Sequence, residues 1–149
     1  MNGLDALNAH LQAMPPVAAM RVQAAAWDGE VLRLEAPLDA NVNDKGCAFG
    51  GSMAGMMTLA GWGLLTLKLA AEGLPAEVYV ADSHVRYLKP LYADLGAEAR
   101  LEQGVDWPAF LHAYRERGRA RAAVVATLRD PDGNVVAELS GRFAALRPA

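Results

Sequence analysis

The chain has 149 residues, of which 53% are hydrophobic and 21% charged, and its formal net charge at pH 7 is −3. This length predicts a single domain over residues 1–149 with enough apolar residues to bury a core, and the composition excludes a disordered chain. The acidic balance argues against nucleic-acid binding, which needs a basic face for phosphates. With one cysteine, Cys47, we expect no disulfide and no cysteine-based metal site, and a cytoplasmic location as the default.

The first third of the chain predicts one helix and two strands. Leucines recur at helical spacing over residues 4–11, and the proline pair that follows Met14 should end this helix. Residues 17–27 are expected to form a strand, which an Asp-Gly turn at residues 28–29 joins to a second strand over residues 31–36. The start of the chain lacks the basic residues and the unbroken apolar run of a secretion signal.

A long apolar helix is predicted over residues 51–72. Gly73 stands where a helix often ends, and Pro75 blocks continuation. No charged residue occurs between Lys45 and Lys68, so this stretch is long enough to cross a membrane. Its many glycines and the soluble-type strands that follow favour another interpretation, a central helix buried in protein. We therefore expect no membrane insertion.

The rest of the chain predicts sheet. Alternating apolar and polar residues indicate strands, and Asp106 is placed to cap a short helix over residues 107–116. Four strands are expected, over residues 79–88, 95–101, 119–129 and 135–146. Short turns between most of them favour antiparallel pairing, and only the central helix is apolar enough to cover the concave side of the sheet. The sequence therefore predicts an α+β hotdog fold, a curved antiparallel sheet wrapped around a long central helix. An edge strand left open in such a sheet favours pairing with a second copy.

The most informative segment runs from Asn41 to Ser52 into the central helix. The adjacent glycines Gly50 and Gly51 allow a ligand to approach the backbone closely. The first N–H groups of the helix would face that ligand and could stabilise negative charge on a thioester oxygen, as an oxyanion hole does. The alternative is an ordinary junction between loop and helix, with Ser52 near the cap.

This segment, NVNDKGCAFGGSMAGMMTLAGWGLLTLKL, and the later VYVADSHVRYLKPL resemble the hotdog family of thioesterase-like proteins found as the C-terminal domain of YiiD-type proteins. The resemblance covers nearly the whole chain. It implies acyl thioesters of acyl carrier protein or coenzyme A as substrates, no cofactor, and a homodimer, which could pair into tetramers, with sites at the subunit interface. Malonyl-acyl-carrier-protein decarboxylase activity is attributed to some members. The asparagine they use would fall on Asn43, with Asn41 as the nearby alternative, and Cys47 stands where the family has threonine.

The residues present fit decarboxylation better than hydrolysis. Hotdog thioesterases with an HGG motif usually place a carboxylate two helical turns further on, whereas this chain has Phe49 for the histidine and Thr58 at the carboxylate position. No Asp or Glu occurs from residue 46 to residue 71, although hydrolysis normally needs a base or a carboxylate nucleophile. Loss of carbon dioxide needs only stabilisation of the enolate. Asn43, Gly50 and Gly51 are thus the predicted catalytic residues, and the predicted substrate-binding residues are Asn41, Ala48, Phe49, Ser52, Thr58, Asp82 and His84.

Other polar residues have simpler interpretations. Asp82, His84 and Arg86 alternate along one strand and are either an acid–base group at the rim of a substrate channel or the solvent side of the sheet. Four arginines between residues 115 and 121 are either a solvated surface or the docking site of an acidic carrier protein. The histidines show no metal-binding spacing, so no metal site is expected. Thioester hydrolysis and a non-catalytic acyl-thioester binding module are the alternative functions.

Overall fold

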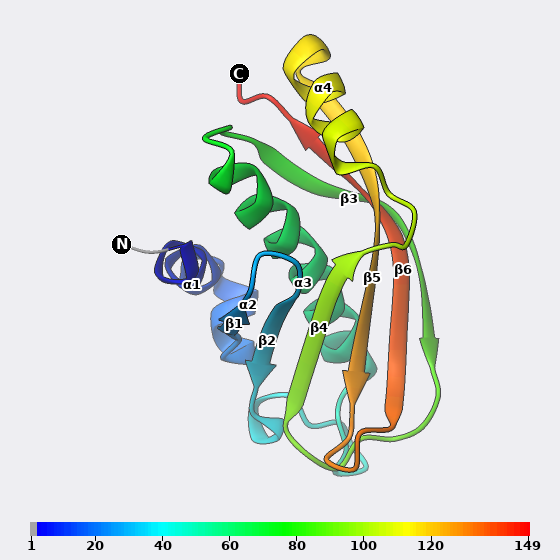
Figure 1. Cartoon of the computed structure of the whole chain (residues 1–149). Coiled ribbons are helices and arrows are strands. Elements are labelled where there is room, and N and C mark those ends of the chain that lie inside the picture. Colours follow the sequence, from blue (N-terminus) through cyan, green and yellow to red (C-terminus); the bar gives the residue numbers. More distant parts are fainter. Residues whose placement is uncertain (1–2) are drawn as a thin grey trace.

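In the computed structural model, which describes residues 3–149, a six-stranded antiparallel sheet curves around one long helix (Figure 1). The sheet order is β1-β2-β4-β5-β6-β3. The strands are β1 (Gln23–Trp27), β2 (Leu32–Ala36), β3 (Glu77–Tyr87), β4 (Leu95–Leu101), β5 (Arg119–Arg129) and β6 (Val135–Leu146). The helices are α1 (Gly3–Ala13), α2 (Pro15–Met20), α3 (Gly50–Ala71) and α4 (Trp107–Arg117), with a short 3-10 turn at Leu38–Ala40. The predicted hotdog arrangement is confirmed.

The expected strand over residues 17–27 is wrong in its first part. Residues Pro15–Met20 form helix α2, and the strand begins only at Gln23. Proline is favourable in the first turn of a helix, where its missing N–H costs nothing, and Ala18, Ala19 and Met20 are good helix formers. Arg21 ends α2 in the left-handed conformation, with φ 56°.

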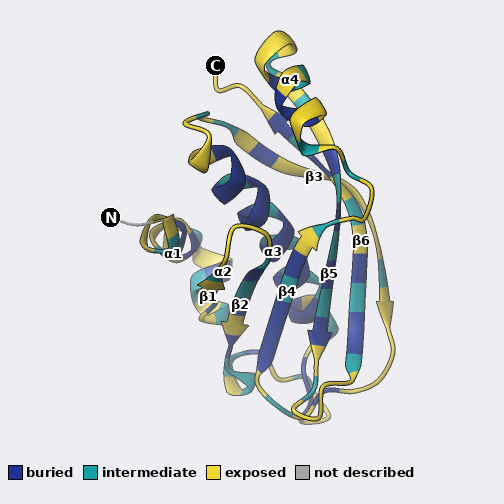
Figure 2. Ribbon diagram, in the orientation of Figure 1, coloured by how far each residue is buried: buried dark blue, intermediate teal, exposed yellow. Residues whose placement is uncertain are grey.

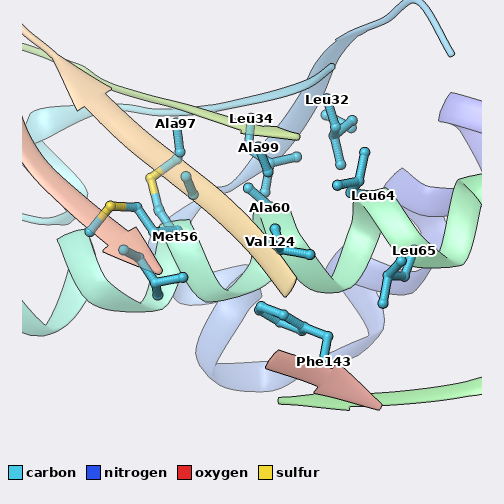
Figure 3. Close-up of a cluster of buried hydrophobic side chains, with 14 of the residues drawn as sticks. Leu32, Leu34, Met56, Ala60, Leu64, Leu65, Ala97, Ala99, Val124 and Phe143 are labelled. Carbon is cyan, nitrogen blue, oxygen red and sulfur yellow. The ribbon is translucent and has the colours of Figure 1, made fainter. Parts of the chain in front are cut away.

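Helix α3 is the centre of the core. Twelve of its 22 residues are buried, and Figure 2 shows it buried along most of its length. Figure 3 shows Met56, Ala60 and Leu64 facing side chains of β2, β4 and β5. Gly61 lets the ring of Phe143 on β6 lie directly against the helix, since a Cβ at residue 61 would stand 2.5 Å from that ring. Small residues on the helix therefore set how closely the sheet can wrap around it.

By length and hydropathy alone, α3 could cross a membrane. In this fold it is the core helix instead, because the sheet and α1 cover it and 61% of its most apolar window is buried.

The two edges of the sheet differ. At the β1 edge, Asn8 of α1 satisfies the backbone of Ala24, donating from Nδ2 to the carbonyl (3.2 Å) and accepting the N–H at Oδ1 (2.7 Å). At the other edge, β3 has no covering element among the described residues, and nine of its eleven residues are exposed. One edge is thus protected by a side chain, and the other is open for pairing.

A bulge in β3 changes which side chains share a face. The pairing with β6 shifts between Val80 and Asp82, so Val80 lies opposite Phe143 on the helix side while Asp82 lies opposite Arg142 on the outer side. Uninterrupted alternation would place Tyr79 on the face of Tyr87, and this expectation is wrong. Tyr79 shares the outer face with Asp82 and His84, whereas Tyr87 points toward α3.

Two glycines of α3 test the packing directly. Gly→Ala in a helix normally stabilises by about 0.5–1 kcal/mol. At Gly55 a Cβ would stand 3.7 Å from the Met20 methyl, so Gly55→Ala should raise the free energy of unfolding by about that amount. At Gly61 the clash with Phe143 should instead lower it by about 1–3 kcal/mol. Urea denaturation at equal protein concentration measures both, and equal stabilisation by the two substitutions would contradict this account of the core.

Candidate functional site

The loop before α3 is a small hairpin that delivers the chain to the start of the helix. The N–H of Phe49 donates to the carbonyl of Asn41 (2.7 Å), Val42 pairs with Ala48, and the N–H of Asn43 donates to the carbonyl of Cys47 (2.7 Å). The loop is also tied to the body of the protein, because the N–H of Ala48 donates to the carbonyl of Leu91 at 2.8 Å. These bonds fix the position at which α3 begins.

Asn43 holds the tip of this hairpin. Its Oδ1 accepts from the N–H groups of Lys45 (2.8 Å) and Cys47 (3.2 Å), which is an Asx turn. Its Nδ2 lies 3.2 Å from the Cys47 Sγ, a weak acceptor. The side chain is half-buried. The oxygen is therefore committed to the loop, while the Nδ2 donors are oriented and only weakly used.

Asn41 uses both of its amide donors inside the fold. It is 3% exposed, and its Nδ2 donates to the carbonyls of Met20 (2.9 Å) and Pro37 (2.8 Å). Its Oδ1 is buried without a hydrogen-bond partner among the described residues. Since its donors are already used and its side chain is shielded, Asn41 is less available to a substrate than Asn43.

The start of α3 leaves its first backbone N–H groups without acceptors inside the helix. The N-cap residue is Phe49, whose side chain cannot accept a hydrogen bond. Its backbone carbonyl accepts from the N–H of Met53 at 3.0 Å, which is the first hydrogen bond of the helix. The N–H groups of Gly50, Gly51 and Ser52 have no acceptor within the helix, and the helix dipole favours negative charge beside them. This junction can stabilise an oxyanion, as the glycine pair predicts.

Two aromatic side chains border these N–H groups. The Tyr87 hydroxyl at the end of β3 donates to the carbonyl of Gly50 (3.2 Å), and a Cβ at Gly50 would fit against the Tyr87 ring at 3.6 Å. The Phe49 ring, 54% exposed, lies so close to Gly51 that a Cβ there would stand 2.5 Å from it. An aromatic ring thus lies beside each glycine, and the two rings can form the walls of a thioester-binding site.

Tyr87 is a site residue that the sequence interpretation missed. The sequence signal that could have found Tyr87 is Gly73, where the chain reverses after α3 with φ 69°. Because of this reversal β3 runs antiparallel to α3, and the end of β3 returns to the beginning of the helix.

The remaining predicted binding residues lie along the loop and α3. Ala48 and Ser52 are buried next to the glycine pair, at 5% and 7% exposure. Thr58 is half-buried, and its hydroxyl donates to the carbonyl of Ala54 in its own helix at 2.9 Å. That bond occupies the hydroxyl proton of Thr58, so this residue can offer a substrate only an acceptor.

Asp82 and His84 leave the sheet on the face opposite to α3. Asp82 pairs with Arg142, whose Nε lies 3.1 Å from both carboxylate oxygens, and His84 lies opposite Ser140. The hydrogen bond from Arg142 lowers the pKa of the Asp82 carboxyl, which makes it a weaker base. These facts favour the interpretation of both residues as the solvent side of the sheet.

No metal site is apparent among residues 3–149, where no three His, Cys, Asp or Glu side chains form a suitable group. The buried thiol of Cys47 contacts Asn43, and Asp44 is exposed beside Lys45 at 2.9 Å.

Comparison with known proteins agrees with the fold. The chain matches, over residues 4–147, the family described as "Putative thioesterase (yiiD_Cterm)". A Chlorobaculum tepidum protein of unknown function has a TM-score of 0.90 and 25% identity, covering 97% of this chain and 94% of its own. A Shewanella oneidensis protein named "putative thioesterase" has a TM-score of 0.86 and 25% identity, covering 98% of each chain. The thioesterase HI1161 from Haemophilus influenzae shares the fold, with a TM-score of 0.75, 16% identity, and coverage of 99% and 92%.

The two roles of Asn43 can be separated by substitution. Asn43→Ala removes the acceptor of two backbone N–H groups and should lower the free energy of unfolding by about 1–2 kcal/mol. Asn43→Asp keeps that acceptor, so its stability should stay within about 0.5 kcal/mol of the native protein. Thermal and urea denaturation measure both variants, and an equal loss in the two would show that the Asx turn is not what holds the loop.

Proposed function

Because the chain belongs to the YiiD C-terminal-domain family of thioesterase-like hotdog proteins, we propose that it decarboxylates a malonyl thioester, giving an acetyl thioester that can prime fatty-acid synthesis. The carrier is acyl carrier protein or coenzyme A. The observation that carries this proposal is a set of free N–H groups at Gly50 and Gly51 with no carboxylate on the helix behind them.

The reaction needs little from the protein beyond this arrangement. The bond between the malonyl carboxylate and the methylene carbon breaks, carbon dioxide leaves, and the electron pair passes into a thioester enolate. The N–H groups of Gly50 and Gly51 stabilise the enolate oxygen as its charge develops. Water then supplies a proton to the methylene carbon and is left as hydroxide, which gives the acetyl thioester with its carbon–sulfur bond intact.

We assign to Asn43 the role of orienting the malonyl group. Its Oδ1 is fixed by the loop, so Nδ2 points in a defined direction, and the weak contact to the Cys47 thiol can be exchanged for a stronger bond to a carboxylate or a thioester oxygen. The surrounding Ala48, Phe49 and Met53 are apolar and favour loss of the charged carboxylate by keeping water away.

Hydrolysis of an acyl thioester is the second candidate, and the family description and the thioesterase names of structural neighbours favour it. It would need a base. Two candidate carboxylates are Asp44, exposed and paired with Lys45, and Asp82, paired with Arg142 on the outer face. Neither is arranged to activate water at the start of α3.

Mass spectrometry of malonyl-acyl carrier protein incubated with the purified protein tests the proposal. We expect acetyl-acyl carrier protein with its thioester intact. Release of the free carrier thiol would show that the protein hydrolyses the thioester and would contradict decarboxylation. Malonyl-acyl carrier protein that remains unchanged would favour a non-catalytic binding module.

The variant Asn43→Asp tests the role of the amide. It keeps the acceptor that braces the loop but loses the Nδ2 donor and adds a negative charge beside the malonyl carboxylate. We expect its turnover to fall by about 10²-fold or more while its melting temperature stays unchanged. Turnover within about twofold of the native protein would remove Asn43 from the mechanism.

We further propose that two copies pair through β3 to form a homodimer, as the open edge favours. The exposed Val80 and Tyr87 on the helix side and Tyr79 on the outer side would be covered by antiparallel pairing of the two β3 strands. This pairing would extend the sheet from one copy into the other and bring both α3 helices to the same side.

Val80→Lys places two like charges at this interface and should shift the protein to monomer in sedimentation equilibrium. Val31→Lys, in the hairpin at the far side of the sheet, is the matched control and should leave the dimer intact. A monomeric native protein, or a Val80→Lys dimer of unchanged affinity, would contradict pairing through β3.

A further inference from the structure

A groove with a basic rim lies at one end of the sheet, between α4 and the adjoining ends of β5 and β6 (Figure 1). Its volume is about 810 Å³. Small apolar side chains form its floor, and the lining includes Ala109, Ala113, Ala120, Ala123, Ala144 and Leu146. Three arginines also line it: Arg117 from the end of α4, and Arg119 and Arg121 from the start of β5. We refer to it as the arginine groove.

The arginines of the groove form no ion pair within 4.0 Å among the described residues, although Arg121 interacts at longer range with the Asp82 carboxylate. Within the described part of the chain, Arg117, Arg119 and Arg121 are all exposed, and none has a carboxylate oxygen within 4.0 Å. The one acidic residue in the lining, Asp106, uses its carboxylate to cap α4, accepting from the N–H of Ala109 at 3.0 Å.

Most other arginines have acidic partners. Arg33, Arg86 and Arg142 are each paired with a carboxylate, and just outside the groove Arg115 lies 3.6 Å from Glu72. In a chain of net charge −3, the arginine groove is therefore a local concentration of free positive charge, which attracts an acidic partner.

The strand register places this groove relative to the site of a second copy. Arg119 lies opposite Leu146 on β6, which lies opposite Glu77 at the start of β3. At the other end of β3, Tyr87 contacts Gly50 at the start of α3. If two β3 strands pair in antiparallel fashion, the start of β3 in one copy lies beside the end of β3 in the other. Arg119 is then about 14 Å, or three strand spacings, from the strand end that contacts the second copy's glycine pair.

We propose that the arginine groove of one protomer docks an acidic acyl carrier protein whose acyl group enters the site of the partner subunit. This inference rests on the proposed function and on the proposed pairing, and it selects the carrier protein over coenzyme A. Arg119 and Arg121 project from the outer face of the sheet and the glycine pair lies on the helix side, so the pantetheine arm would pass around the ends of the paired β3 strands to reach the partner's site.

The shape of the arginine groove favours a protein over a phosphate group. Arg119 and Arg121 lie two residues apart on one face of β5, about 7 Å along the strand, and Arg117 extends the row from α4. A row of guanidinium groups over an apolar floor matches carboxylates spaced along an acidic helix with apolar side chains between them. Both ends of α4 border the groove: at the N-terminus the Asp106 carboxylate already accepts from the N–H of Ala109, and the C-terminus beside Arg117 is the end whose dipole does not attract anions.

Calorimetric titration with acyl carrier protein tests the docking without any turnover. The test variant carries Arg117→Gln, Arg119→Gln and Arg121→Gln. The matched control carries Arg21→Gln, Arg100→Gln and Arg129→Gln, which removes the same charge from outside the groove. The native protein should bind both the apo and the holo carrier protein, with affinity that falls as salt rises. The test variant should bind both at least about tenfold more weakly and with little salt dependence, while the control stays within about twofold.

Three outcomes of the titrations would overturn the docking proposal. The first is that the native protein does not bind the carrier protein, and the second is that the test and control variants lose equal affinity for it. If the test variant weakens binding of coenzyme A or of the holo carrier but not of the apo carrier, the groove recognises a phosphate instead. A failure of malonyl decarboxylation with carrier binding intact would reject the proposed reaction and leave the docking site standing. Unchanged melting temperatures would show that the substitutions leave the fold intact.

Discussion

The close packing of α3 against the concave face of the sheet is the constraint on which the structure depends. The helix carries no charged residue before Lys68, and its glycines let Phe143 and Leu32 approach the backbone where any side chain would clash. A helix this apolar is stable in water only when protein covers most of it, so the sheet curves around it. The same packing fixes the N-terminus of α3, because the helix cannot slide within a well-packed core.

The candidate site follows from that placement. A hairpin braced by Asn41 and Asn43 holds the chain immediately before the helix, and Tyr87 from β3 fixes the carbonyl of Gly50. The result is a rigid set of backbone donors with apolar surroundings and no neighbouring base, which suits a reaction whose main requirement is stabilisation of an enolate. The edge strand that supplies Tyr87 is also the open edge, so the site and the proposed dimer interface share one element.

Much of the architecture could be predicted from the sequence because it depends on periodicity. The central helix, the alternation in β4, and the cap of α4 by Asp106 are local signals, and the structure confirms them. Helix α2 could not be separated from a strand, since a short apolar run after two prolines fits both. The bulge near Ala81 carries no signal in its residue types, and it reverses the face of Tyr79. The sequence could not separate the roles of Asn41 and Asn43, because these depend on their hydrogen-bond partners. Asn41 donates to the carbonyl of Met20, a residue distant in sequence, whereas Asn43 bonds within its own loop.

A crystal structure with a non-cleavable malonyl thioester analogue bound would test the central claim most directly. We expect the thioester oxygen to lie about 3 Å from the N–H groups of Gly50 and Gly51, with Asn43 Nδ2 turned from the Cys47 thiol toward the malonyl group. An analogue bound with its thioester oxygen away from the start of α3, or beside Asp82 and His84 on the outer face, would contradict it.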